Sequence, residues 1–290
     1  MDDAITFAEY GEFLYETVFI VAPKYAFKAP TKDELRDFIA AGHNVVFVTS
    51  PVYTDKVAAF LKAFHLTPTE KGLLLTHERE MVNDTTLVRT PAVDVPLFPK
   101  APVVYRGIAL DTHGIRAFVP IVQAPAGARL AHEGSAQRLL ATHALVVGFE
   151  GLTNGRLVVS GSADMFNDTL LPHNRAVVEA LVAWATHEAG RLEMENVRVE
   201  KVAGAVDVEQ EGMMFVNDTL RVTFDLWTSE RGARVPYDAD DVLVELRLVD
   251  PVIRAPAART DGATYRFETV LPDQFGVYTV LVNYTLCPGD

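Results

Sequence analysis

The sequence predicts an α/β domain with a doubly wound, mostly parallel sheet over residues 1–190, followed by an immunoglobulin-like β-sandwich over residues 191–290. Three observations predict this fold class. The chain has 290 residues, a length suited to two domains. Short apolar runs alternate with amphipathic helical segments in the first part. After residue 192 the hydrophobic period changes to two, as expected for antiparallel strands.

The first part begins with the apolar run VFIVA at residues 18–22, which ends at Pro23 and has the pattern of a buried parallel strand. Thr31 and Glu34 then form a capping box that opens a helix. Strand, helix, strand and helix follow one another, so we expect right-handed crossovers and a parallel sheet. The later expected elements are a strand at 44–49, a helix at 54–64, short strands at 103–104 and 117–122, parallel strands at 144–148 and 156–160, and a helix at 174–188.

A tyrosine corner is predicted near the end of the chain, in the sequence LPDQFGVY at residues 271–278. Asp273 lies in the turn, Gly276 follows it, and Tyr278 enters the next strand. In such a corner the phenol hydrogen-bonds to the returning backbone while its ring stays in the core. The motif predicts fold and carries no information about function.

Charge and composition exclude several function classes. The formal net charge of −13 argues against nucleic acid and against anionic membrane surfaces, because both require a basic face. The sequence has no apolar run of 18 residues, which predicts no transmembrane helix. Cys287 is the single cysteine, so no disulfide can form within the chain.

No catalytic, metal-binding or cofactor-binding residues are predicted. Ser160, Ser162 and Asp164 follow a predicted strand, but the local sequence VSGSA is not a nucleophile elbow, and a strand-end turn or cap explains it. The eight histidines are scattered without metal-ligand spacing, and no glycine-rich phosphate loop is present.

Two clusters are candidate interaction surfaces. Aromatic residues near the start of the chain can dock a partner or pack in the core. An acidic cluster before residue 242 departs from the calcium-loop pattern and is interpreted as a solvated loop. The residues concerned are Tyr10, Phe13 and Tyr15 in the first cluster and Asp238, Asp240 and Asp241 in the second.

Four N-x-Ser/Thr sequons are possible N-glycosylation sites. Each contains Asn followed by Thr two positions later, and Asn-Asp-Thr is also a common turn or cap sequence. The asparagines are Asn83, Asn167, Asn217 and Asn283.

Separate sequence blocks resemble one family, the 48 kDa subunit of the dolichyl-diphosphooligosaccharide–protein glycosyltransferase. The blocks are YGEFLY at 10–15, YRGI at 105–108, SGSADMF at 160–166 followed by NDT, PYDADD at 236–241, VDPVIR at 249–254 and LPDQFGVY at 271–278. They cover nearly the whole chain in the order of the family.

The resemblance implies a non-catalytic structural subunit of the oligosaccharyltransferase complex, on the lumenal side of the endoplasmic reticulum membrane. It implies partners of three kinds: the catalytic subunit, ribophorin-type subunits and small defender-type subunits. It also implies an amidotransferase-like sheet domain, here incomplete at its N-terminus. The family has a signal peptide, a first strand and helix before residue 10, and one C-terminal membrane span. The present sequence shows none of these features, so we expect a lumenal part whose sheet exposes an edge.

A second interpretation remains open on the sequence alone. It is a soluble sugar- or ligand-binding protein with an accessory β-sandwich, in which a cleft at the strand ends near Ser162 and Asp164 holds the ligand.

Overall fold

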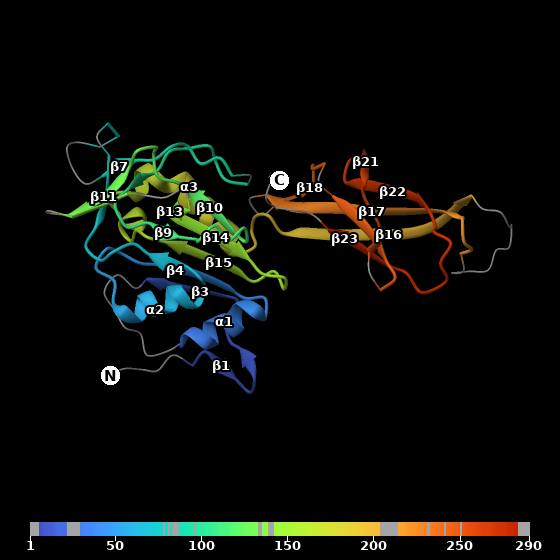
Figure 1. Ribbon diagram of the computed structural model, residues 1–290, viewed down its shortest axis with the longest axis horizontal. Coiled ribbons are helices and arrows are strands. Elements are labelled where there is room, and N and C mark those ends of the chain that lie inside the picture. Colours follow the sequence, from blue (N-terminus) through green and yellow to red (C-terminus); the bar gives the residue numbers. More distant parts are fainter. Residues whose placement is uncertain are drawn as a thin grey trace. The chain divides into compact units, whose positions relative to one another are not determined.

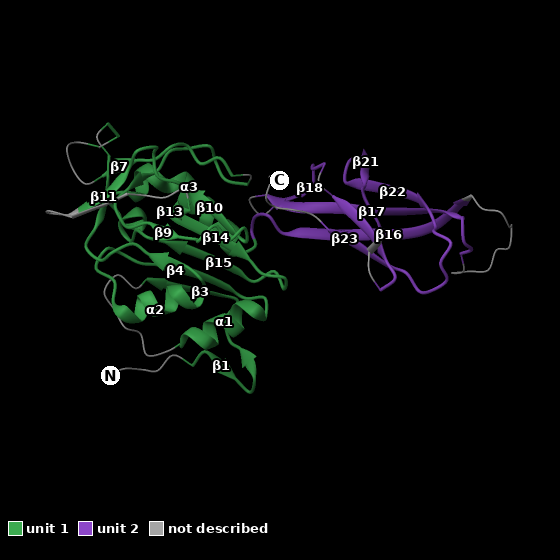
Figure 2. Cartoon of the chain, viewed as in Figure 1, with its two compact units in different colours: residues 1–187 green, residues 188–290 purple. Residues whose placement is uncertain are grey.

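The computed structural model describes residues 6–21, 30–77, 79–80, 82, 87–95, 97–132, 135–138, 142–203, 214–230, 233–240, 242–249 and 251–283. The chain forms two compact units, Met1–His187 and Glu188–Asp290 (Figure 2). Unit 1 combines a mixed sheet with helices, and unit 2 consists of strands. The predicted class of an α/β part followed by an all-β part is therefore confirmed.

Unit 1 is built around a five-stranded sheet with the order β10-β14-β15-β4-β3. Helices cover both of its faces, α1 and α2 on one side and α3 on the other (Figure 1). The bounds are β3 Thr17–Val21, α1 Lys32–Ala40, β4 Asn44–Val48, α2 Asp55–Ala63, β10 Phe118–Val122, β14 Val146–Glu150, β15 Arg156–Ser160 and α3 Leu171–Ala185.

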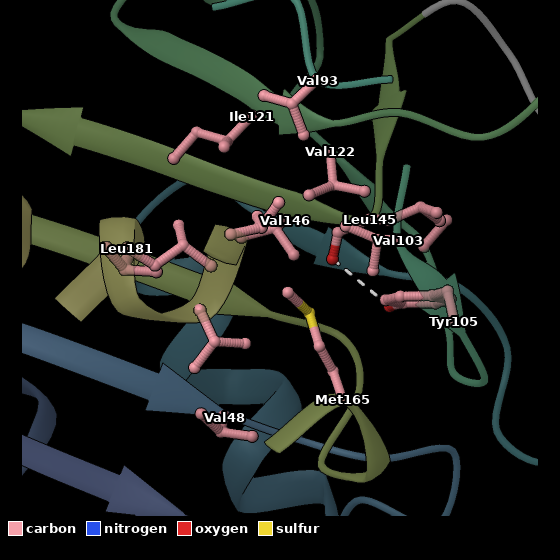
Figure 3. Packing of buried hydrophobic residues seen from close by; sticks show 14 of the residues in the cluster. Val48, Val93, Val103, Tyr105, Ile121, Val122, Leu145, Val146, Met165 and Leu181 are labelled. Carbon is pink, nitrogen blue, oxygen red and sulfur yellow. Dashed lines mark hydrogen bonds between the residues drawn. The ribbon is translucent and has the colours of Figure 1, made fainter. Parts of the chain in front are cut away.

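Alternate residues of the central strands divide the core of unit 1 into two clusters. Val45 and Phe47 of β4 face α1 and α2, whereas Val46 and Val48 face α3. This alternation follows from the period of two in a strand. Figure 3 shows the packing on the α3 side, where Val48, Val146 and Leu181 lie in the same cluster.

The local signals for α1 are confirmed. The backbone amide of Thr31 donates to Glu34 Oε2 at 2.6 Å, and the amide of Glu34 donates to Thr31 Oγ1 at 3.3 Å, which completes the predicted capping box. Helix α3 begins at Leu171, three residues before the predicted start at 174. Pro172 does not prevent this, because the first turn of a helix tolerates the missing amide of proline.

The prediction of a mostly parallel sheet is wrong. Strands β3, β4 and β15 are parallel, but β14 pairs antiparallel with both β10 and β15. Only residues 151–155 connect β14 to β15. A parallel crossover needs a dozen or more residues, so this short link can form only a hairpin.

Strand β3 lies at the edge of the sheet. Its apolar sequence predicts a buried strand, and the structure differs from that prediction. Its Val18 and Ile20 pack toward α1 and α2, while Phe19 is 51% exposed and Val21 is 64% exposed on the opposite face. An edge strand with exposed apolar side chains is a template for association with other chains.

Charged residues at this edge are expected to suppress self-association. We predict that the double variant Phe19→Lys/Val21→Lys elutes as monomer at concentrations where the unmodified chain forms larger species. Its free energy of unfolding should change by no more than about 1 kcal/mol. Size-exclusion chromatography with light scattering measures the first quantity. The control is Leu152→Lys, which adds a charge at a fully exposed apolar residue of the β14–β15 turn; equal behaviour of the two variants would contradict the prediction.

Short sheets and one 3-10 helix complete unit 1. Many of the connections between these strands contain proline, which interrupts strand pairing. The elements are β1 Ala8–Glu9, β2 Glu12–Phe13, β5 Thr67–Pro68, β6 Leu74–Thr76, β7 Val88–Arg89, β8 Val104–Tyr105, β9 Leu110–Asp111, β11 Arg129–His132, β12 Ser135–Arg138, β13 His143–Ala144 and η1 Asp164–Phe166.

Unit 2 is a sandwich of two antiparallel sheets. The first has the order β16-β17-β22-β21 with β18 also on β17, and the second has the order β20-β19-β23. Both sheets contribute to one core, which includes Val222 and Phe224 of the first sheet and Val244 and Leu246 of the second. The bounds are β16 Leu192–Ala203, β17 Thr219–Glu230, β18 Ala233–Pro236, β19 Leu243–Arg247, β20 Pro251–Pro256, β21 Ala258–Asp261, β22 Thr264–Val270 and β23 Thr279–Asn283.

Candidate functional site

Two sequence blocks that lie about fifty residues apart meet at the end of β15. We call residues 105–108 and 160–166 together the motif junction. The amide of Ile108 donates to the carbonyl of Gly161 at 3.0 Å, and Ser162 Oγ donates to the carbonyl of Arg106 at 2.7 Å. Arg106 Nε donates to Asp164 Oδ2 at 2.6 Å. Each block therefore holds the backbone of the other.

The junction requires glycine at two positions because the backbones approach closely. A Cβ atom at Gly161 would lie 2.4 Å from the carbonyl oxygen of Ile108, and one at Gly107 would lie 2.4 Å from that of Gly161. Tyr105 packs against the junction from within the core, where its Oη donates to the carbonyl of Ile108 at 2.6 Å. The same Oη lies 3.3 Å from the carbonyl oxygen of Leu145 (Figure 3). Burial raises the pKa of Tyr105 well above its usual value, so the phenol stays a neutral donor.

The hydroxyl of Ser162 serves a structural purpose. It donates to the Arg106 carbonyl and accepts the amide proton of Met165 at 3.1 Å, which holds the start of η1. Asp164 forms an ion pair with Arg106. These contacts match the interpretation of the segment as a strand-end turn and occupy the side chains on which a ligand cleft was predicted.

The N-terminal aromatic residues separate into core and surface. Phe13 packs edge-on against Phe38 with ring centroids 5.0 Å apart, and it also contacts Phe7. Tyr10 is 99% exposed in the turn between β1 and β2, and Tyr15 is exposed as well. Of the predicted interface residues in this segment, Tyr10 and Tyr15 are thus accessible to a partner.

The acidic loop is held in a defined conformation. Asp238 forms an ion pair with Arg259. The buried Tyr265 donates its hydroxyl proton to the carbonyl of Tyr237 at 2.9 Å and accepts the amide proton of Ala239 at 3.2 Å. Asp240 is exposed, and Asp241 lies outside the described residues. The role of Tyr265 was not predicted, although an aromatic residue at an inward position of a strand was a usable signal.

At the predicted tyrosine corner, the phenol binds the backbone of the preceding loop. Tyr278 Oη donates to the carbonyl of Gln274 at 3.0 Å, and the Tyr278 ring packs at the margin of the unit 2 core. Asp273 and Gly276 are exposed in the preceding loop, and a Cβ at Gly276 would meet the Leu248 side chain.

A buried ion pair of unit 1, between Arg156 and Glu150, was missed by sequence reasoning. Arg156 is 1% exposed, and its guanidinium donates to Glu150 Oε1 at 3.2 Å and to the carbonyl of Trp184 at 2.5 Å. It also stacks on the Trp184 ring. Burial raises the pKa of Glu150, and the Arg156 charge opposes that shift. The sequence feature that could have predicted this pair is an arginine at the start of the otherwise largely apolar strand RLVVS.

A second unpredicted cluster connects the β5, β9 and β13 segments. Thr67 Oγ1 lies 2.8 Å from His113 Nε2, and Asp111 accepts the backbone amide of His113 at 2.8 Å. Burial alone would raise the pKa of Asp111, but hydrogen bonds from Thr142 and His113 and the nearby imidazole of His143 hold that pKa below its usual value. Among the residues that the structure describes, no three His, Cys, Asp or Glu side chains form a possible metal site.

The sequons differ in what surrounds their asparagines. Asn167 Oδ1 accepts the backbone amides of Thr169 and Leu170, both at 3.0 Å, ahead of α3. Asn217 lies in an exposed turn before β17, and Asn283 is exposed at the end of β23. Asn83 lies outside the described residues.

No helix in the described part of the chain has both the length and the hydropathy needed to cross a bilayer. This finding concerns the helices of the described residues alone.

The chain is similar to known proteins over nearly its whole length. The sequence profile described as "OST48, N-terminal domain" matches residues 1–188, and that of the "OST48 middle domain" matches residues 202–287. The 48 kDa subunit of dolichyl-diphosphooligosaccharide–protein glycosyltransferase from Drosophila melanogaster is 24% identical over 324 residues, which cover 98% of this chain and 71% of that protein. The corresponding protein of Arabidopsis thaliana is 21% identical, with 98% and 72% covered.

Two further similarities cover part of the chain. The glycosyltransferase subunit WBP1 of Saccharomyces cerevisiae is 32% identical over 146 residues, which cover 48% of this chain and 33% of that protein. Among solved structures, the N-terminal domain described as mmIFT52 superposes with a TM-score of 0.46 and 14% identity, covering 59% of this chain and 77% of the other.

Proposed function

Because the chain belongs to the OST48 family, we propose that it is a subunit of the oligosaccharyltransferase complex and acts on the lumenal side of the endoplasmic reticulum membrane. The observation that carries the proposal is the match of two consecutive family domains along the chain. Relatives from an insect, a plant and a yeast are all named as subunits of this glycosyltransferase.

Within that complex the chain has a structural, non-catalytic role. The family blocks of unit 1 support this role. The side chains of Ser162, Asp164 and Arg106 form hydrogen bonds with one another and with backbone atoms. Such contacts stabilise a shape that other proteins can bind. The partners are a catalytic subunit, ribophorin-type subunits and small defender-type subunits, and no cofactor takes part.

The contact residues of this chain are Tyr10 and Tyr15 of the N-terminal segment and Asp238 and Asp240 of the unit 2 loop. The exposed ring of Tyr10 supports this assignment, because exposed tyrosines commonly anchor protein interfaces. Phe13 supports the segment from within the core. We further propose that unit 1 has an amidotransferase-like fold and that unit 2 has an immunoglobulin-like fold. The Tyr278 hydrogen bond supports the assignment of unit 2.

Affinity purification tests the proposed function. The tagged full-length protein is isolated from detergent-solubilised microsomes of its own cells, and the co-purifying proteins are identified by mass spectrometry. We expect recovery of the catalytic oligosaccharyltransferase subunit. An unrelated lumenal protein with the same tag is the control, and equal recovery with both baits would refute the proposal.

A paired variant tests the proposed contact residues. Tyr10→Ala/Tyr15→Ala should lower recovery of the catalytic subunit about tenfold or more, because interface tyrosines often contribute over 1 kcal/mol each. The control is Leu152→Ala, which removes a fully exposed apolar side chain elsewhere in unit 1. Unchanged recovery with the double variant would remove these residues from the interface and leave the subunit assignment intact.

A further inference from the structure

The sequon at Asn217 has a backbone geometry that the sequon at Asn167 does not share. The segment Phe215-Val216-Asn217-Asp218 is a turn in which the amide of Asp218 donates to the carbonyl of Phe215 at 3.1 Å. Asn217 occupies its third position with φ of 65°, a conformation that asparagine tolerates better than most residues. Thr219, the hydroxyl residue of the sequon, begins β17.

Buried contacts hold the backbone of this turn in place. Asp218 is fully buried, its Oδ2 accepts the amide of Phe215 at 2.8 Å, and Lys201 Nζ lies 3.0 Å from the same oxygen. The amide of Asn217 donates to the carbonyl of Leu271 at 3.1 Å. The backbone of the sequon is therefore fixed while the Asn217 side chain is exposed.

The Asn217 carboxamide also differs from that of Asn167 in its hydrogen bonds. Within the described residues, no hydrogen bond engages the Asn217 side chain. Asn167 instead accepts two backbone amides with Oδ1 and donates with Nδ2 to Asp164 Oδ1 at 3.2 Å. A sugar on Nδ2 of Asn217 would therefore break no hydrogen bond between described residues. A sugar on Nδ2 of Asn167 would replace a proton of the amide group that binds Asp164 and the residues before α3.

An exposed aromatic residue stands two positions before the attachment point in the sequence. Phe215 is the first residue of the turn in which Asn217 is the third, and it is 39% exposed. The Lys201 ammonium lies 5.6 Å from the ring centroid, and the remaining exposed part of the ring faces solvent. The C–H groups of a pyranose carry partial positive charge and are attracted to the negative face of an aromatic ring. The first sugar of a glycan at Asn217 can therefore cover Phe215.

From these observations we propose that Asn217 carries an N-linked glycan whose first sugar packs on Phe215. The reaction joins Asn217 Nδ2 to the anomeric carbon of an oligosaccharide borne on a polyprenyl diphosphate. The bond from that carbon to the diphosphate oxygen breaks, the lipid diphosphate leaves with the electron pair, and Nδ2 loses one proton. This inference rests on the proposed function, because the sequon meets such a donor only in the lumen.

Occupancy is tested on the protein purified from its own cells. Peptide N-glycosidase treatment in ¹⁸O-labelled water converts a glycosylated asparagine to labelled aspartate, and peptide mass spectrometry then locates the label. We expect the label at Asn217 in most molecules and, in an Asn217→Gln variant, the loss of one glycan. Label at other sequons with none at Asn217 would overturn the inference and leave lumenal location standing. No label at any sequon would overturn the inference about Asn217, while recovery of the catalytic subunit in the affinity purification decides the proposed function separately.

The packing on Phe215 is tested by a cycle of four proteins. Two of the proteins carry a glycan trimmed to its first sugar, one with Phe215 and one with Phe215→Leu. The other two carry Asn217→Gln in the same two backgrounds and have no sugar at this site. The melting temperatures of each pair are compared. We expect the sugar to raise the melting temperature by about 2–4 °C with Phe215 in place. The increase should be lost with Phe215→Leu. An equal increase in both backgrounds would show that the sugar does not pack on the ring.

Discussion

Replacement of Arg156 by methionine is expected to lower the free energy of unfolding by about 3–5 kcal/mol, because it leaves the carboxylate of Glu150 without its partner in a largely buried site. The variant also loses the hydrogen bond from Arg156 to the carbonyl of Trp184 in the last turn of α3, where a positive charge is favourable. Urea denaturation followed by circular dichroism measures the change.

Two controls separate this effect from a general loss of charge. Arg175→Met removes an exposed arginine that pairs with Glu179 on the surface of α3, and it should cost about 0.5 kcal/mol or less. The double variant Arg156→Met/Glu150→Gln should be more stable than Arg156→Met alone, since no unpaired charge remains. If the two arginine variants lose equal stability, the buried pair has no special role.

The Arg156→Met variant should also change the pH dependence of stability. Burial raises the pKa of Glu150, and loss of the opposing Arg156 charge raises it further. A carboxyl group with a higher pKa in the folded state binds its proton more readily when folded. The variant should therefore regain stability as the pH falls from 7 toward that raised pKa. Denaturation series at several pH values test this sign, and a further loss of stability in mild acid would contradict it.

Replacement of Gly161 by alanine is expected to cost about 3 kcal/mol, because the new methyl group would lie 2.4 Å from the Ile108 carbonyl and 2.7 Å from Tyr105 Oη. The carbonyl belongs to a backbone that the motif junction holds in place. The variant must separate the two blocks and weaken the hydrogen bond from Ile108 to Gly161. Thermal and urea denaturation measure the loss.

The matched control is Gly151→Ala, in which a Cβ would have ordinary contacts at 3.5 and 3.7 Å. It should change the free energy of unfolding by less than about 1 kcal/mol. Both substitutions add one methyl group to a glycine beside β14 or β15, so a similar cost for the two would show that the junction is not tightly packed.

Local features of the fold could be read from the sequence. The capping box at Thr31 depends on residues three positions apart, and the period of two after residue 192 depends on near neighbours, so both signals lie within a few residues. The six family blocks are likewise visible without a structure. The packing of two of these blocks against each other in the motif junction could not be predicted, because the contacts between residues 105–108 and 160–166 join segments far apart in the chain.

The main helices and strands, the order of an α/β part before an all-β part, and the family can be read from the sequence alone. The antiparallel direction of β14 relative to β15, the edge position of β3 and the burial of Arg156 with Glu150 are visible only in the folded chain. Periodicity and caps report on neighbours along the chain, whereas strand partners and burial depend on which distant surfaces cover one another.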